Sequence, residues 1–325
     1  MKRWRVLSAA TAAFAALWLG TGAARADYPE RTVKIVVPFP AGGTTDILAR
    51  IVAEGLDRKL GRRFIVENRP GASGNLGSQG VAQSDADGYT LLMGTVNTHG
   101  INSSMFKSMP YDAVKDFAPI TMVGATPNVM MAHPSLGVSD VAGLIKAARE
   151  TPGAIDFGST STGGSPHMSG ELLKMLAEIK LNHVPYRGGA PMLNDLIGGH
   201  IKLGFDNLPS AIAHVKAGSV KALAVTTKQR YPSLPDVPTM EEAGIPGYEV
   251  NAWFGLFAPA GTPRPVVDKL QRTIAEILAE PAVRARLLEI GAIPGGMSPD
   301  EFGAVVRREV ERWPEVVARM GLKID

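Results

Sequence analysis

Residues 33–46 read VKIVVPFPAGGTTD, and this stretch decides the fold. Its first five residues form a compact, mostly β-branched run of the kind found in buried strands. Gly42 and Gly43 then let the backbone turn and approach a ligand with no Cβ in the way. Thr44, Thr45 and Asp46 are all good N-cap residues, and apolar residues recur behind them at helical spacing. This order predicts a strand, a turn and a helix.

The predicted helix start is a candidate anion site. Free N–H groups and the positive end of the helix dipole meet there, which suits a carboxylate. A tight turn needed only for packing is the alternative, because a Gly-Gly pair alone is weak evidence. The strand before it and the helix after it favour the binding interpretation. A second stretch, STSTGGSPH at residues 159–167, offers several hydroxyl donors and also stands between a short strand and an apolar helix.

The first 26 residues have the pattern of a secretory signal peptide. Lys2, Arg3 and Arg5 precede an almost wholly apolar stretch, and Ala24-Arg25-Ala26 resembles a small-x-small cleavage site. A membrane anchor is the competing interpretation, but the apolar stretch is short for a bilayer core of ~30 Å. The lipid-attachment cysteine of a lipoprotein is also missing. We therefore expect a soluble protein that is exported to the periplasm.

Composition narrows the classes of function. The whole chain has 34 Lys and Arg residues against 31 Asp and Glu, but four of the basic residues lie in the predicted signal peptide. The remainder is close to neutral, which removes the support for a nucleic-acid partner. The absence of cysteine excludes disulfides and thiolate chemistry, and the six histidines show no metal-binding spacing. We expect no metal and no cofactor.

Strand-like and helix-like segments alternate along the chain, which predicts an α/β fold with mostly parallel sheets. Residues 121–123 and 129–132 are expected to form two strands where the chain crosses from one domain to another. Residues 252–258 are expected to cross back. A helix is expected over residues 138–150, capped by Ser139.

These crossings set the expected domain boundaries. The first domain comprises residues 27–125 plus 250–325, and the second comprises residues 126–249. Each half presents a strand, a turn rich in Gly, Ser and Thr, and a helix. A cleft between two such sheets is a recurrent small-molecule site.

Three further groups of polar residues follow predicted strands. Asp206 and Asn207 either receive a polar ligand group or cap the next helix, and both interpretations stay open. The same alternatives hold for Thr95 and Asn97, with their neighbours Thr98 and His99. His167 lies in a first helical turn, where it is either a ligand donor or, as is commoner for a single histidine, a structural residue.

Other features argue against catalysis and nucleotide binding. Residues 71–77 resemble a Gly-rich nucleotide turn, but they follow the second strand rather than the first, so a plain turn is favoured. No nucleophile elbow occurs, and Ser165 and His167 are too close in sequence for a Ser–His pair. Arg187 suits an ion pair better than a carboxylate clamp. A binding protein explains the many neutral donors better than an enzyme does.

Taken together, these motifs resemble the receptors of tripartite tricarboxylate transporters, also called Bug-type receptors. The resemblance covers nearly all of the chain after the signal peptide. It rests on the segments YPERTVKIVVPFPAGGTTD, VENRPGASGNLGS, DGYTLLMGT, DFAPI, FGSTSTGGSPHMSGE, VPYRGG, FDNLPSA and WFGLFAPAGTP. It implies the fold of type II periplasmic binding proteins, in which two α/β domains enclose a ligand cleft.

The resemblance also implies a ligand, a set of partners and a site. The ligand is a small organic acid, a mono- or dicarboxylate, which a monomeric receptor delivers to the membrane permease subunits of the transporter. We expect the ligand-binding residues to be Phe39, Ala41, Gly42, Gly43, Asp46, Thr95, Asn97, Ser159, Thr160, Gly163, Ser165, His167 and Asp206. Residues 97–99 and 126–128 differ from the small apolar residues expected there, which leaves the identity of the acid open.

Two alternatives remain beside transport. The liganded protein could instead be presented to a membrane sensor kinase, because both roles use a closed, liganded receptor. A periplasmic hydrolase on the same fold is the other alternative, with Ser165 as the residue to test.

Overall fold

Strand β1 spans Val33–Val37 and leads through a glycine turn into helix α2, Thr44–Leu60, as the opening motif predicts. The structure is a computed structural model that describes residues 28–322, and the fold below lies in residues 31–322. The other strands are β2 (Phe64–Asn68), β3 (Thr90–Thr95), β4 (Phe117–Ala132), β5 (Asp156–Ser159), β6 (Asn182–Pro185), β7 (Leu203–Asn207), β8 (Lys221–Val225), β9 (Asn251–Pro259) and β10 (Ile293–Pro294).

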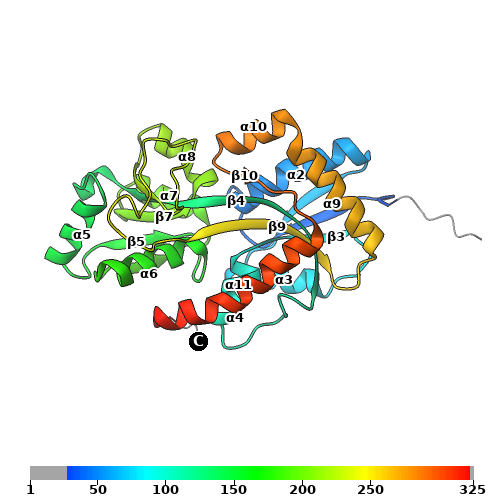
Figure 1. Ribbon diagram of the computed structural model, residues 1–325, viewed down its shortest axis with the longest axis horizontal. Coiled ribbons are helices and arrows are strands. Elements are labelled where there is room, and N and C mark those ends of the chain that lie inside the picture. Colours follow the sequence, from blue (N-terminus) through cyan, green and yellow to red (C-terminus); the bar gives the residue numbers. More distant parts are fainter. Residues whose placement is uncertain (1–27, 323–325) are drawn as a thin grey trace, which may run out of the picture. The chain divides into compact units, whose positions relative to one another are not determined.

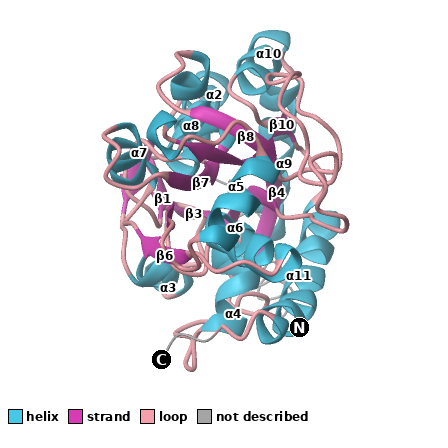
Figure 2. Ribbon diagram, turned by 90° about the vertical axis from the view of Figure 1, so that its left-hand side faces the viewer, coloured by secondary structure: helices cyan, strands magenta, loops and turns pink. Residues whose placement is uncertain are grey.

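Helices lie around the strands (Figure 2). The longer ones are α3 (Asn75–Ala82), α5 (Val141–Glu150), α6 (Ser165–Ala177), α7 (Gly189–Ile197), α8 (Leu208–Lys216), α9 (Arg264–Ala279), α10 (Pro281–Glu289) and α11 (Pro299–Arg319). Shorter turns of helix are η1 (Ala72–Gly74), η2 (Asn97–Ile101), α4 (Asn102–Met105) and η3 (Pro134–Leu136). Among residues 28–322, no helix is both long and apolar enough to cross a membrane.

The strands form one continuous sheet in the order β2-β1-β3-β9-β4-β7-β5-β6, with β8 and β10 paired to β4. We call β1, β2, β3, β9 and the part of β4 paired with β9 the first half-sheet. The end of β4, with β5, β6, β7 and β8, is the second half-sheet. In both halves the strands that lead into the helices run parallel, β1 beside β2 and β3, and β5 beside β6 and β7.

Strand β4 connects the two half-sheets, and β9 runs antiparallel beside it (Figure 1). The prediction of two separate strands at residues 121–123 and 129–132 was wrong, because β4 is continuous over 16 residues. Gly124 and Pro127 break the apolar pattern of the sequence. They nevertheless stay in the sheet, since Phe254 and Asn251 of β9 lie opposite them.

Two predicted helix caps were also wrong by a residue or more. Helix α2 has Gly43 at its N-cap position and no side-chain cap, although Thr44 to Asp46 were the expected caps. Helix α5 begins at Val141 and is capped by Asp140 rather than Ser139, with the Asp140 carboxylate accepting a hydrogen bond of 2.7 Å from the Gly143 N–H. A carboxylate is the stronger acceptor for a helix N–H.

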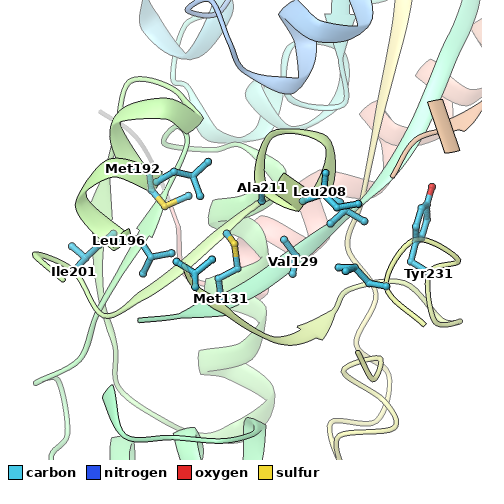
Figure 3. Packing of buried hydrophobic residues seen from close by; sticks show 12 residues of the cluster. Val129, Met131, Met192, Leu196, Ile201, Leu208, Ala211 and Tyr231 are labelled. Carbon is cyan, nitrogen blue, oxygen red and sulfur yellow. The ribbon is translucent and has the colours of Figure 1, made fainter. Parts of the chain in front are cut away.

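The core of the second half-sheet holds two helices in place at the edge of the sheet. Val129 and Met131 of β4 pack with Met192 of α7 and Leu208 of α8 in one buried cluster (Figure 3). Each fully buried side chain of this size stabilises the fold by about 1.5–3 kcal/mol. Their packing fixes the points at which α7 and α8 begin.

Candidate ligand-binding site

A cavity of about 50 Å³ lies at the carboxyl ends of strands from both half-sheets. By volume it has room for about four water-sized groups, such as the oxygens of an acid head group. It is lined by Phe39, Pro40, Gly43, Thr44, Thr45, Thr95, Val96, Asn97, Thr160, Ser161, Gly164, Ser165, Pro166, Gly188, Gly189, Asp206, Asn207, Ala252 and Phe254. We call it the inner cavity.

In the part of the chain that the structure describes, four helices begin at the inner cavity: α2, α6, α7 and α8. The residues at their N-cap positions are Gly43, Gly164, Gly188 and Asn207. None of the four makes a side-chain cap hydrogen bond. Uncapped first-turn N–H groups and four positive helix ends therefore face one small space, which favours an anion there.

The start of α2 shows how these donors are left free. The first helical hydrogen bond runs from the Ile47 N–H to the Gly43 carbonyl, at 3.0 Å. The N–H groups of Thr44 and Thr45 have no hydrogen-bond partner among residues 28–322. Both residues line the inner cavity and are buried, so their N–H groups and the Thr45 hydroxyl can donate hydrogen bonds to a bound oxygen.

Asp46 shapes this first loop rather than facing the cavity. Its carboxylate accepts hydrogen bonds from the Gly42 N–H at 3.0 Å, from Arg50 at 2.9 Å and from Asn68 at 3.0 Å. Burial by itself raises the pKa of Asp46, but these hydrogen bonds and the Arg50 charge outweigh it and hold the pKa below its usual range. Asp46 is thus an anion that is neutralised within its own half-sheet.

The 159–167 loop divides into cavity-lining residues and supporting residues. Thr160 and Ser165 line the inner cavity. Ser159 instead lies 2.7 Å from His183 Nε2, and the Gly163 N–H donates to His167 Nδ1 at 3.0 Å. The His167 ring stacks on His183, with centroids 3.8 Å apart, and burial lowers the pKa of His183 to about 3.

A buried network fixes the hydroxyl of Ser165. Ser165 Oγ donates to Asn128 Oδ1 at 3.2 Å, and Asn207 Nδ2 donates to both of these oxygens. Asn128 Nδ2 in turn donates to Ser169 Oγ at 2.9 Å. The partners of Ser165 Oγ are amides and not an imidazole, so this hydroxyl lacks a general base.

Asp206 is the acidic residue of the inner cavity. It is 2% exposed, and its carboxylate accepts a hydrogen bond of 2.7 Å from the Asn207 N–H through Oδ1. Its Oδ2 has no hydrogen-bond partner among residues 28–322. Burial raises the pKa of Asp206 to about 7, although the hydrogen bond from the Asn207 N–H lowers it in part.

The structure brings together some of the residues predicted for the site and not others. Those that line the inner cavity are Phe39, Gly43, Thr95, Asn97, Thr160, Ser165 and Asp206. Those that lie outside its lining are Ala41, Gly42, Asp46, Ser159, Gly163 and His167. Thr98 and His99 also point elsewhere, since the His99 ring stacks on Phe257 with centroids 3.9 Å apart. Ligand contact by each predicted residue stays a prediction.

Several lining residues were not predicted. They are Pro40, Thr44, Thr45, Val96, Ser161, Gly164, Pro166, Gly188, Gly189, Ala252 and Phe254, whereas Asn207 was left open between ligand contact and helix capping. A signal was available for Gly188 and Gly189, because this pair precedes a helix just as Gly42 and Gly43 do. No local signal pointed to Phe254, which reaches the cavity only because β9 passes between the half-sheets.

A larger outer cavity, of about 530 Å³, adjoins the inner one and shares Phe39, Pro40, Thr160, Ser161 and Gly188 with it. Arg187 is the one charged residue in its lining. Arg187 makes no ion pair among residues 28–322, and this lining contains no acidic residue.

The loop before α3 also lines the outer cavity. Its residues 71–74 all have positive φ, with values of 45° for Ala72 and 53° for Ser73, which are unusual for residues with a Cβ. Asn97 and Asn102 hold this conformation by donating hydrogen bonds to the Ser73 carbonyl at 3.0 and 3.1 Å.

Among residues 28–322, no cluster of three His, Asp or Glu side chains could hold a metal.

Comparison with known proteins shows which family the chain resembles. Residues 48–322 match the model of the tripartite tricarboxylate transporter family receptor. Protein BugT of Bordetella pertussis is 35% identical over 298 residues, which cover 91% of this chain and 91% of BugT.

Two solved structures are similar over most of the chain. The R. palustris protein Rpa4515, solved with adipate, is 42% identical with a TM-score of 0.90, covering 91% of this chain and 99% of that one. MatC from Rhodopseudomonas palustris, solved with bound malate, is 34% identical with a TM-score of 0.85, covering 89% and 100%. These likenesses confirm the predicted fold class. The chain belongs to the tripartite tricarboxylate transporter receptor family, and it is a solute-binding receptor and not an enzyme.

Proposed function

We propose that this protein captures a small mono- or dicarboxylate in the inner cavity and delivers it to the permease subunits of a tripartite tricarboxylate transporter. The observation that carries the proposal is the convergence of four uncapped helix starts on one cavity. Such a site binds a carboxylate through N–H and hydroxyl groups that are already in place, so it needs no arginine clamp.

The volumes of the two cavities suit an acid whose chain extends well beyond one carboxylate. The inner cavity, of about 50 Å³, takes one carboxylate, and the outer cavity, of about 530 Å³, takes the rest of the ligand. The similar proteins solved with adipate and with malate make a dicarboxylate the first class to test. Arg187 lies where it could attract a second carboxylate toward the outer cavity.

Capture then works by closure of two domains. We assign residues 27–125 plus 250–325 to one domain and residues 126–249 to the other, with the hinge where β4 and β9 pass between the half-sheets. Two hydrogen bonds hold the halves together beside the cavities: Thr44 Oγ1 to Ser210 Oγ at 3.3 Å, and Ser73 Oγ to the Thr162 carbonyl at 2.8 Å. Breaking both would open the site to ligand.

The receptor acts in the periplasm as a monomer after removal of residues 1–26. The signal-peptide pattern of those residues supports the location. Deletion of the gene would abolish uptake of the acid. A receptor that serves only a sensor kinase would leave uptake intact when the transporter is expressed independently.

Isothermal titration calorimetry tests the binding step. The protein is unfolded and refolded to remove any bound acid, then titrated with adipate, malate and shorter monocarboxylates. We expect one site per chain for at least one of them. Ser165→Ala should weaken this binding, while Ser84→Ala, which removes a hydroxyl bonded to the Val81 carbonyl in α3, should not. No heat with any carboxylate would refute the proposal.

A further inference from the structure

One polar atom in the inner cavity is left without a partner. Asp206 stands at the carboxyl end of β7, and its Oδ2 makes no hydrogen bond within residues 28–322. This oxygen faces the start of α7, because a Cβ built on Gly189 would lie 2.7 Å from it. Buried polar atoms are generally hydrogen-bonded, so we expect a bound ligand to supply the missing partner of this carboxylate oxygen.

The surroundings of Asp206 offer no compensating charge. Each element packed against the end of β7 places an uncharged residue beside it. These residues are Val129 of β4, Ser159 of β5, Ser165 of α6, Gly189 of α7 and Ser210 of α8. The acidic residue of the neighbouring loop, Asp46, is engaged by Arg50 and lies outside the cavity lining. The Arg187 side chain belongs to the lining of the outer cavity.

Resting on the proposed carboxylate-binding function, we infer that the side chain of Asp206 is a neutral carboxylic acid when the ligand is bound. Its Oδ2–H donates a hydrogen bond to a carboxylate oxygen of the ligand. Above pH 7, where the empty site holds an ionised Asp206, capture of each anion therefore takes up one proton from solvent, which forms the O–H bond at Asp206 Oδ2, and no bond of the ligand changes. Asp206 thereby becomes a residue that selects ligands with an anionic oxygen over ligands with an ammonium group at this position.

The small size of the cavity is the reason for this protonation state. An ionised Asp206 and a ligand carboxylate in about 50 Å³ would be like charges in contact, and such pairs share a proton rather than both ionise. The four helix starts stabilise the charge of the ligand. Burial already brings the pKa of Asp206 to about 7 in the empty site, so an added anion moves it higher.

The alternative is an ionised Asp206 that accepts a hydrogen bond from a hydroxyl or ammonium group of the ligand. The two accounts differ in the number of protons that binding takes up. In our account the pKa rises on binding, so affinity is highest below pH 7 and falls by about tenfold for each pH unit above 7. In the alternative, binding takes up no proton at any pH.

Calorimetry of the refolded full chain with adipate and with malate tests this. Each titration is run in phosphate and in Tris, whose heats of ionisation differ, at pH 6 and at pH 8.5. We expect uptake of about one proton per ligand at pH 8.5 and close to none at pH 6. In Asp206→Asn, whose amide is a neutral donor at every pH, the proton uptake and the pH dependence of affinity should both disappear. Wild-type binding without proton uptake at pH 8.5 would overturn the inference and leave the proposed function standing.

A second measurement needs no variant of the protein. Carbon-13 NMR of labelled Asp carboxyls follows Asp206 through a pH titration, with Asp46 as an internal control. We expect Asp206 to titrate near pH 7 in the free protein and higher with adipate present, while Asp46 titrates below its ordinary range in both. A free-protein titration of Asp206 near pH 4 would overturn the inference. Failure of every acid to bind at either pH would instead refute the proposed function.

Discussion

Ser73 Oγ donates a hydrogen bond of 2.8 Å to the carbonyl oxygen of Thr162, which joins the loop after β2 to the loop after β5. Ser73 belongs to the first half-sheet region and Thr162 to the second, and both residues line the outer cavity. The bond is made by a residue at φ 53°, in a loop that Asn97 and Asn102 hold in place. A strained loop that bonds across a cavity is suited to hold a closed state.

We therefore predict that Ser73→Ala weakens closure. The variant loses one neutral hydrogen bond, worth about 0.5–1.5 kcal/mol, and keeps the same backbone strain because Ala also has a Cβ. Affinity for the bound acid should fall by about two- to tenfold, mostly through faster release, as stopped-flow fluorescence would show. Ser84→Ala is the matched control. An unchanged release rate in Ser73→Ala would show that this bond does not hold the closed state.

Gly189→Ala should block the inner cavity. A Cβ at this position would lie 2.7 Å from Asp206 Oδ2, so either the side chain of Asp206 moves or the cavity fills. Gly189 does not have positive φ, so alanine meets no backbone strain there. We expect more than a tenfold loss of affinity in calorimetry with little change in melting temperature.

Gly80→Ala provides the control for a glycine in a helix away from the cavity. Its added Cβ meets nothing closer than Arg69 Nη1 at 3.6 Å. The control should bind normally. Equal affinity in the Gly189 and Gly80 variants would show that Gly189 is not part of the binding site.

Asp46→Asn should lower stability through the first loop. The native carboxylate accepts from the Gly42 N–H, Arg50 and Asn68, and its folded pKa lies below the unfolded value. Its stabilisation is therefore present above the unfolded pKa, near 4, and is lost as the pH falls through the folded pKa. We expect a loss of about 1–3 kcal/mol at pH 7 in urea unfolding. The stabilities of the wild type and the variant should converge once the pH lies below the folded pKa of Asp46, and a constant difference at all pH values would contradict this.

One buried and one half-buried histidine should make the fold sensitive to mild acid. Burial lowers the pKa of His99 and of His183 to about 3, so both stay neutral in the folded chain. The unfolded chain binds these protons near pH 6.5, which means that stability is full above pH 6.5 and declines as the pH falls from there toward 3. Each histidine adds a slope of up to about 1.4 kcal/mol per pH unit. Urea unfolding between pH 7.5 and 5 measures it, and His99→Gln should show a shallower slope than the wild type.

The sequence predicted most elements because their signals are local. The β-branched run of β1 and the apolar spacing of α2 both lie within a few residues of each other, and both elements form where expected. The continuity of β4 could not be predicted in the same way. Gly124 and Pro127 look like breaks until β9 pairs beside them, and that pairing joins residues more than 120 positions apart.

The residues of the candidate site also divide into those with a local sequence signal and those without one. Thr160 and Ser165 follow from a local motif, and they line the cavity. Ser159 and His167 belong to that motif too, but their side chains face His183 and Glu171 instead, since the direction of a side chain within a loop depends on what packs behind it. Phe254 reaches the cavity through sheet pairing, which has no local signal.

A crystal structure of the refolded protein, saturated with the acid that binds most tightly in calorimetry, is the most direct test of the central claim. We predict one carboxylate in the inner cavity, with its oxygens within about 3 Å of backbone nitrogens at the starts of α2 and α6. Asp206 Oδ2 should lie within hydrogen-bond distance of a ligand oxygen. A ligand held in the outer cavity by Arg187 alone, with the helix starts unoccupied, would contradict it.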